Sequence, residues 1–137
     1  MQIARLMLVD DNVDNLEILS VILSEHCQVA GYTSAEEALT ALEATSPDVV
    51  LLDIGMSPVD GLQCLAAMRA RPGYGAIPAI ALTAYARDTE RSAFLTAGFQ
   101  AVVTKPIVDP QQLFETVAAV LAAAAAPRLD SAHRKTA

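Results

Sequence analysis

Polar side chains follow four separate apolar segments of the chain, and their types suit the binding of a metal ion and a phosphoryl group. The positions are Asp10 and Asp11 after residues 6–9, Asp53 after 49–52, Thr83 after 80–82 and Lys105 at the end of 102–104. Three neighbouring carboxylates repel one another, so such a cluster is typical of a site that a cation shares. Oxygen ligands favour Mg²⁺, completed by waters and a phosphate oxygen. A carboxylate beside that ion can attack phosphorus and form an acyl phosphate, while an ammonium and a hydroxyl bind the other phosphoryl oxygens.

These groups can act together only if the segments before them are neighbouring strands. The run Val49-Val50-Leu51-Leu52 is continuously apolar and partly β-branched, as in a parallel strand that is buried on both faces. In an open α/β sheet, ligands and chemistry collect at the carboxyl ends of the strands. Asp53 is therefore placed where a reactive group is expected.

Apolar spacing along the chain predicts five strands that alternate with five helices. The strands are expected at 3–9, 27–30, 49–53, 77–82 and 101–104, with Gly31 ending the second. The helices are expected at 15–25, from Ser34 onward, at 61–70, at 87–97 with Gly98 as the stop, and from Pro110 to about 126. Ser34 and Glu37 match a capping box, and Ala38, Leu39 and Leu42 supply the buried stripe of the second helix.

This alternation predicts an α/β fold, a flavodoxin-like doubly wound (βα)5 sandwich. Its parallel five-stranded sheet should have the order 2-1-3-4-5. The first and third strands then lie side by side, which brings Asp10 and Asp11 next to Asp53.

Composition limits the other classes of function. The 137 residues fit one domain at 1–126, followed by a disordered tail at 127–137. The net charge of −7 argues against binding to nucleic acid or to an anionic membrane. No apolar run approaches the roughly 18 residues that span a bilayer, so a cytoplasmic location is expected. Cys27 and Cys64 read as core residues, and His26 and His133 as surface residues.

Each polar motif alone has an ordinary structural explanation: Asp10-Asp11 as a turn, Thr83 as a helix cap and Lys105 as a surface lysine. Their combination is specific. It resembles the receiver domain of two-component response regulators, of the single-domain chemotaxis-regulator-like type. The resemblance covers residues 4 to about 122 and is carried by Val9-Asp10-Asp11-Asn12, Asp53-Ile54-Gly55-Met56, Asp60-Gly61, Thr83-Ala84-Tyr85, Ala97-Gly98-Phe99 and Lys105-Pro106.

The resemblance implies that Asp53 accepts a phosphoryl group from a phosphohistidine on a histidine kinase or a histidine phosphotransfer protein. Mg²⁺ would then be held by Asp11 directly, Asp10 largely through water, Asp53 and the backbone carbonyl of Gly55. Thr83 and Lys105 would bind the phosphoryl group, and the Lys105-Pro106 peptide bond would be cis. A downstream protein would dock on the face formed by helix 87–97, the fifth strand and the last helix.

Three positions depart from the usual pattern of that family. Ser57 separates Met56 from Pro58, which places the proline one residue late. Val102 stands where the family usually has an aromatic that rotates inward, so such a rotation cannot report phosphorylation here. Gly55 and Tyr85 occupy the two positions that modulate access of water to the phosphoryl group.

Other functions compete with a phosphorylated switch. The chain could instead be a pseudo-receiver scaffold that is not phosphorylated, for which Val102 is the support, or an intermediate phosphate relay or sink. A Mg²⁺-dependent phosphohydrolase needs a second acid two residues after its nucleophile, where this chain has Gly55. We therefore expect no enzyme with multiple turnover, only self-phosphorylation from a phosphodonor and slow autodephosphorylation.

Overall fold

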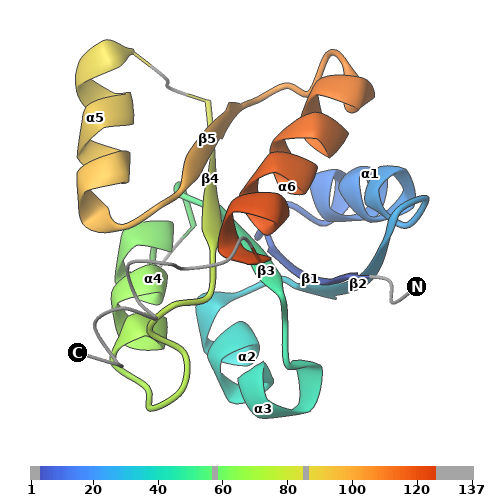
Figure 1. The fold of residues 1–137 in the computed structure, drawn as a ribbon. Coiled ribbons are helices and arrows are strands. Elements are labelled where there is room, and N and C mark those ends of the chain that lie inside the picture. Colours follow the sequence, from blue (N-terminus) through green and yellow to red (C-terminus); the bar gives the residue numbers. More distant parts are fainter. Residues whose placement is uncertain (1–3, 57–58, 85–86, 126–137) are drawn as a thin grey trace.

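The computed structural model of the chain describes residues 4–56, 59–84 and 87–125. The expectations for Ser57, Pro58, Tyr85 and the tail at 127–137 therefore lie outside the described residues. The sheet has five parallel strands in the order β2-β1-β3-β4-β5 (Figure 1), which confirms the predicted fold class and strand order. The strands are β1 Ala4–Val9, β2 Cys27–Tyr32, β3 Val49–Asp53, β4 Ala79–Thr83 and β5 Ala101–Thr104.

Helices cover both faces of this sheet (Figure 1). They are α1 Val13–Leu23, α2 Ala35–Thr40, α3 Leu42–Thr45, α4 Gly61–Arg69, α5 Asp88–Ala97 and α6 Pro110–Ala125. α1 and α6 pack on one face, where they form a core with Leu51 of β3, and α2, α4 and α5 pack on the other, around Val50 and Leu52. The continuously apolar run of β3 thus supplies both cores, because successive side chains of a strand point to opposite faces.

β2 is longer than the sequence predicts, and the expectation that Gly31 ends it is wrong. The strand continues through Gly31 to Tyr32, which pair with Leu8 and Val9 of β1. A Cβ on Gly31 would lie 3.1 Å from the Leu16 side chain. The glycine is therefore a point of close packing between β2 and α1, where the sequence alone predicts the end of the strand.

The segment after Ser34 forms two short helices in place of the single helix that the sequence predicts. The Ser34 hydroxyl caps α2 by accepting from the Glu37 N–H, but the Glu37 carboxylate accepts from Thr33 and not from Ser34. Ala41, with φ −89° and ψ 0°, lies between α2 and α3. Leu42 is buried as expected. The predicted buried stripe is therefore present, although it is divided between two short helices.

Smaller differences affect other boundaries. α1 begins at Val13, earlier than expected, because the Asn12 side chain caps it by accepting from the Asn15 N–H. β4 begins at Ala79 and not at residue 77, since Pro78 has no N–H for the ladder and contributes only its carbonyl oxygen, 3.0 Å from the Val50 nitrogen.

Candidate functional site

Asp53 is the last residue of the fully buried strand β3, and its carboxylate is held at the carboxyl edge of the sheet. The residue is only 5% exposed, and its neighbour across the ladder is Leu82 of β4. The Gly55 N–H donates to Asp53 Oδ1 at 2.9 Å. That bond orients the carboxylate and leaves Oδ2 directed toward other partners.

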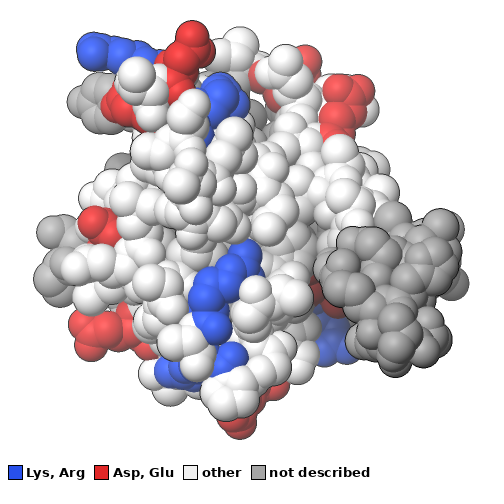
Figure 2. All heavy atoms as spheres, turned by 60° about the vertical axis from the view of Figure 1, so that its left-hand side comes forward, with Lys and Arg blue, Asp and Glu red and all other residues white. Residues whose placement is uncertain are grey.

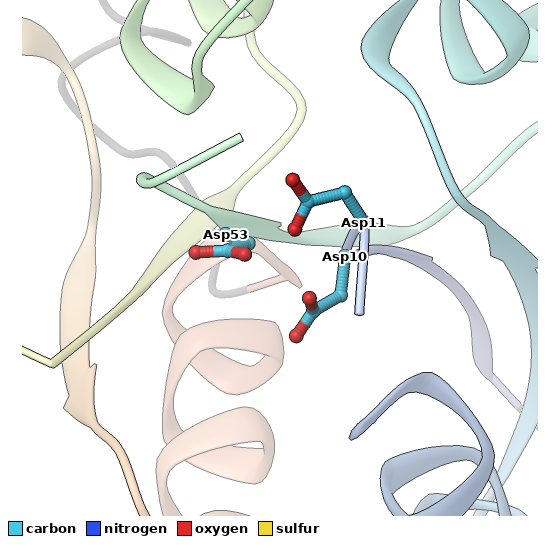
Figure 3. A group of neighbouring side chains, drawn as sticks. All are labelled: Asp10, Asp11 and Asp53. Carbon is cyan, nitrogen blue, oxygen red and sulfur yellow. The ribbon is translucent and has the colours of Figure 1, made fainter. Parts of the chain in front are cut away.

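Asp10 and Asp11 reach the same edge from the end of the neighbouring strand β1 (Figure 3). Asp10 is completely buried and Asp11 is exposed. The Asn12 N–H donates to Asp10 Oδ1 at 2.9 Å. One carboxylate oxygen from each of Asp10, Asp11 and Asp53 lies within 4.8 Å of the others. The predicted cluster of three carboxylates is therefore present.

Lys105 brings a positive charge to this cluster. Its Nζ lies 3.2 Å from Asp53 Oδ2 and 3.3 Å from Asp10 Oδ2. Lys105 follows β5 directly, its N–H donates to the Thr83 carbonyl oxygen at 2.7 Å, and the Lys105-Pro106 peptide bond is cis. Thr83 ends β4 and is 4% exposed. The structure thus brings four strand ends and their polar side chains to one edge.

The site carries excess negative charge, because three carboxylates face one ammonium. Burial raises the pKa of Asp10, and the Asp53 carboxylate raises it further, while the Asn12 N–H and Lys105 act in the opposite direction. Within the described part of the chain, Asp10 Oδ2 accepts no hydrogen bond, although Lys105 lies near it. A buried carboxylate oxygen that accepts no hydrogen bond, in an all-oxygen donor set, fits a hard divalent cation such as Mg²⁺.

Two expected modulating positions can be placed. Gly55 is exposed beside the acceptor, and a Cβ on it would lie 3.6 Å from Asp53 Oδ1. Val102 is partly buried and packs against the core under α4 and α5. The Arg91 guanidinium of α5 donates to the Val102 carbonyl oxygen at 3.4 Å, so β5 contacts α5 through a backbone atom at this position.

Sequence reasoning did not assign a role to the start of α4, which packs directly on the acceptor strand. Asp60 and Gln63 form a reciprocal capping box there. A Cβ on Gly61 would lie 2.6 Å from the Asp53 carbonyl oxygen. In the sequence, Asp60-Gly61 belongs to the motifs that carry the family resemblance, but a glycine directly after an acidic cap also fits an ordinary helix start.

Residues 6–118 match the response regulator receiver domain. The chain belongs to this family. An uncharacterised 14.6 kDa protein of Leptolyngbya boryana is 37% identical over 113 residues, which cover 82% of this chain and 86% of that protein. Protein PilH of Pseudomonas aeruginosa is 32% identical over 120 residues, or 87% of this chain and 98% of PilH. The resemblance inferred from the motifs is confirmed.

Receiver domains also occur within longer proteins among the relatives. Sensor protein GacS of Pseudomonas syringae pv. syringae is 32% identical over 111 residues, which cover 78% of this chain but 12% of GacS. Among solved structures, a CheY-like receiver domain protein from Methanospirillum hungatei has a TM-score of 0.77 at 29% identity and covers 90% of this chain and 97% of its own. Chemotaxis protein CheY4 of Vibrio cholerae, with a TM-score of 0.81 at 23% identity and coverage of 87% and 99%, shares the fold.

Proposed function

We propose that this receiver domain is a phosphorylation-dependent switch of a two-component pathway, with Asp53 as the phosphoacceptor. The observation that supports this most directly is the position of the Asp53 carboxylate. It is buried at a strand end, its Oδ2 is 3.2 Å from Lys105 Nζ, and two further carboxylates lie within 4.8 Å. A structural aspartate at a strand end does not need this surrounding charge.

The proposed reaction joins an oxygen of the Asp53 carboxylate to phosphorus while the P–N bond of a phosphohistidine breaks. The electron pair of that bond stays on the imidazole nitrogen of the donor, which is a histidine kinase or a histidine phosphotransfer protein. Lys105 then pairs with one phosphoryl oxygen, and the Thr83 hydroxyl donates to another. Mg²⁺, held by Asp10, Asp11, Asp53 and the Gly55 carbonyl, would supply positive charge that offsets the phosphoryl oxygens.

The proposed output is a change on the face formed by α5, β5 and α6, where a downstream protein would dock. A groove of about 570 Å³ on this face is lined by Lys105 at the site and by Arg91 of α5. New bonds to Lys105 and Thr83 bias an existing equilibrium of the loop after β4 and of α5. Because Val102 has no ring to rotate, the proposed link between β5 and α5 is the contact of Arg91 with the Val102 carbonyl oxygen.

The proposal also states whether the protein is an enzyme and where in the cell it is located. We expect no multiple-turnover hydrolysis, because Gly55 provides no acid or base beside Asp53, and dephosphorylation should be slow. Among the described residues, no helix is long and apolar enough to cross a membrane. The face in Figure 2 is mostly uncharged, with acidic side chains toward its rim and Lys and Arg side chains in its lower central part. Because the net charge is −7, we expect protein partners and no nucleic acid, and we propose a cytoplasmic location.

Beryllofluoride, which mimics a phosphoryl group on a carboxylate, provides the decisive experiment. Amide chemical shifts are recorded with Mg²⁺ before and after its addition. We expect changes around Asp53, Thr83 and Lys105 that extend into α5 in the wild type. Asp53→Ala should show none, and Glu17→Gln, which removes an exposed carboxylate on α1, should respond as the wild type does.

The competing functions predict other results. A pseudo-receiver scaffold gives no beryllofluoride response in the wild type, and Asp53→Ala then binds the physiological partner normally. A phosphohydrolase turns over a small phosphate ester rapidly. Either result would overturn the proposed function.

A further inference from the structure

Gly61, the first residue of α4, packs directly on the backbone that carries the proposed phosphoacceptor. A Cβ added to Gly61 would lie 2.6 Å from the carbonyl oxygen of Asp53 and 2.9 Å from the Cα of Ile54. Both are backbone atoms, so no change of side-chain rotamer can relieve the contact. Any larger residue must move either the helix or the acceptor segment.

Other bonds tie the same turn of α4 to the acceptor segment. The Gly61 N–H donates to the Ile54 carbonyl oxygen at 3.3 Å. The Asp60 carboxylate accepts from the Gln63 N–H at 2.8 Å, and the Asp60 N–H donates to the Gln63 side chain at 3.0 Å. The start of α4 is therefore fixed by its cap and rests on the Asp53-Ile54 peptide.

The peptide under Gly61 also sets the geometry of the site. Asp53 extends its carboxylate from one side of it, and the chain continues through Ile54 to Gly55, whose N–H donates to Asp53 Oδ1 at 2.9 Å. A shift of this backbone would move the Asp53 carboxylate and the Gly55 carbonyl, which are two of the groups proposed to bind Mg²⁺. Lys105 and Asp10 are anchored on other strands and would not follow.

We propose that Gly61 is a positioning residue for the chemistry of Asp53, an inference that rests on the proposed function. Its missing side chain lets α4 fix the acceptor backbone at a distance that no other residue allows. An alanine must lengthen this distance from 2.6 Å to at least 3.0 Å, and to 3.4 Å or more for an ordinary contact. Functional groups must be held to within about 0.5 Å, and a misplacement of about 1 Å can cost on the order of 100-fold in rate.

The test compares Gly61→Ala with Gly75→Ala. Gly75 is a matched control because a Cβ there would lie 3.7 Å from the Arg69 carbonyl oxygen, an ordinary contact. For each protein, Mg²⁺ affinity is measured by calorimetry, phosphorylation by acetyl phosphate from intact mass, and the fold by circular dichroism and thermal unfolding. A merely structural effect would change thermal stability and leave the affinity of the folded protein unchanged.

We expect Gly61→Ala to weaken Mg²⁺ binding by about tenfold or more and to slow phosphorylation by roughly 10- to 100-fold in the folded protein. Gly75→Ala should match the wild type in both measurements. If Gly61→Ala keeps the wild-type Mg²⁺ affinity and phosphorylation rate, the positioning role is refuted.

A second pair of variants covers the case in which Gly61→Ala does not fold. Asp60→Ala removes the cap that fixes this turn, whereas Asp60→Asn removes the same charge and retains a good cap. Weaker Mg²⁺ binding in Asp60→Ala, restored in Asp60→Asn, supports positioning by the start of α4, and equal affinities refute it. These affinities remain informative if the wild type shows no phosphorylation, a result that would instead refute the proposed function.

Discussion

Replacing Lys105 with methionine, in the absence of metal ions, measures how far this lysine holds the carboxylate cluster together. Methionine retains an unbranched side chain of similar length and removes the charge. In the wild type, Nζ of Lys105 lies 3.2 Å from Asp53 Oδ2 and 3.3 Å from Asp10 Oδ2. In the variant, the buried carboxylates of Asp10 and Asp53 and the exposed carboxylate of Asp11 have no cationic side chain in contact with them among the described residues.

The expected loss of stability follows from these distances. At an effective dielectric constant of about 20, each pair contributes about 5 kcal/mol of direct attraction. Desolvation cancels much of this, and breaking a buried ion pair typically costs about 3–5 kcal/mol. Because the Lys105 side chain is 21% exposed, we expect the lower value, about 3 kcal/mol. For a domain of this size, that loss lowers the melting temperature by roughly 10 °C.

The assay is urea and thermal unfolding with EDTA and then with Mg²⁺. Mg²⁺ should stabilise Lys105→Met more than the wild type, because the ion meets a site with one more uncompensated negative charge. Arg87→Met is the matched control: its pair with Glu90 is 3.9 Å long and its side chain is 85% exposed, so its loss should cost at most about 1 kcal/mol.

Two results would refute this reasoning. The first is a Lys105→Met protein that is as stable as Arg87→Met without metal. The second is a Mg²⁺-dependent stabilisation that is smaller in Lys105→Met than in the wild type, because the lysine would then assist the ion and not compete with it for the carboxylates.

Three further predictions concern pH, thiols and the core. Burial raises the pKa of Asp10 in the folded protein above 3.8. Protonated Asp10 therefore stabilises the metal-free fold. This stabilisation is fully present below about pH 3.8 and is lost as pH rises through the pKa of Asp10 in the folded protein. Mg²⁺ competes with that proton, so Mg²⁺ affinity from calorimetry should fall as pH is lowered toward the raised pKa of Asp10, and an affinity independent of pH would contradict this. Cys27 and Cys64 should react with Ellman's reagent only after unfolding, since both are buried and burial raises both pKa values, that of Cys64 to about 11; rapid labelling of the folded protein would show otherwise. Leu51→Ala should cost about 2–5 kcal/mol in urea unfolding, whereas Val108→Ala, at 87% exposure, should change stability by less than about 0.5 kcal/mol.

The strand ends were predictable because their signal is local and repeated. The apolar runs at 6–9, 49–52, 80–82 and 101–103 are each followed by a polar residue, and the alternation with helices permits few topologies. Once the order 2-1-3-4-5 is inferred, the meeting of Asp10 and Asp11 with Asp53 follows from the adjacency of β1 and β3. Lys105 is placed by the same logic at the end of β5.

The features that escaped prediction depend on contacts between segments distant in sequence. The sequence predicts that Gly31 ends the second strand, but it lies inside β2 against Leu16 of α1. The sequence predicts a helix that begins at Gly61, but the contact of Gly61 with the Asp53 backbone depends on how α4 approaches β3. In both cases a glycine suggests that there is no room for a side chain, but the sequence does not reveal which neighbouring residue occupies that room.

The charges of the site indicate how its parts depend on one another. Asp10, Asp11, Asp53 and Lys105 together carry about two negative charges when all are ionised, which one divalent cation neutralises. Phosphorylation replaces the single charge of the Asp53 carboxylate with roughly two on the phosphoryl group. Without a divalent cation, the modified site would hold about three negative charges around Asp10, a buried residue whose pKa is already raised. Phosphorylation of Asp53 should therefore require the ion, and Lys105 should be drawn toward the phosphoryl group and away from Asp10.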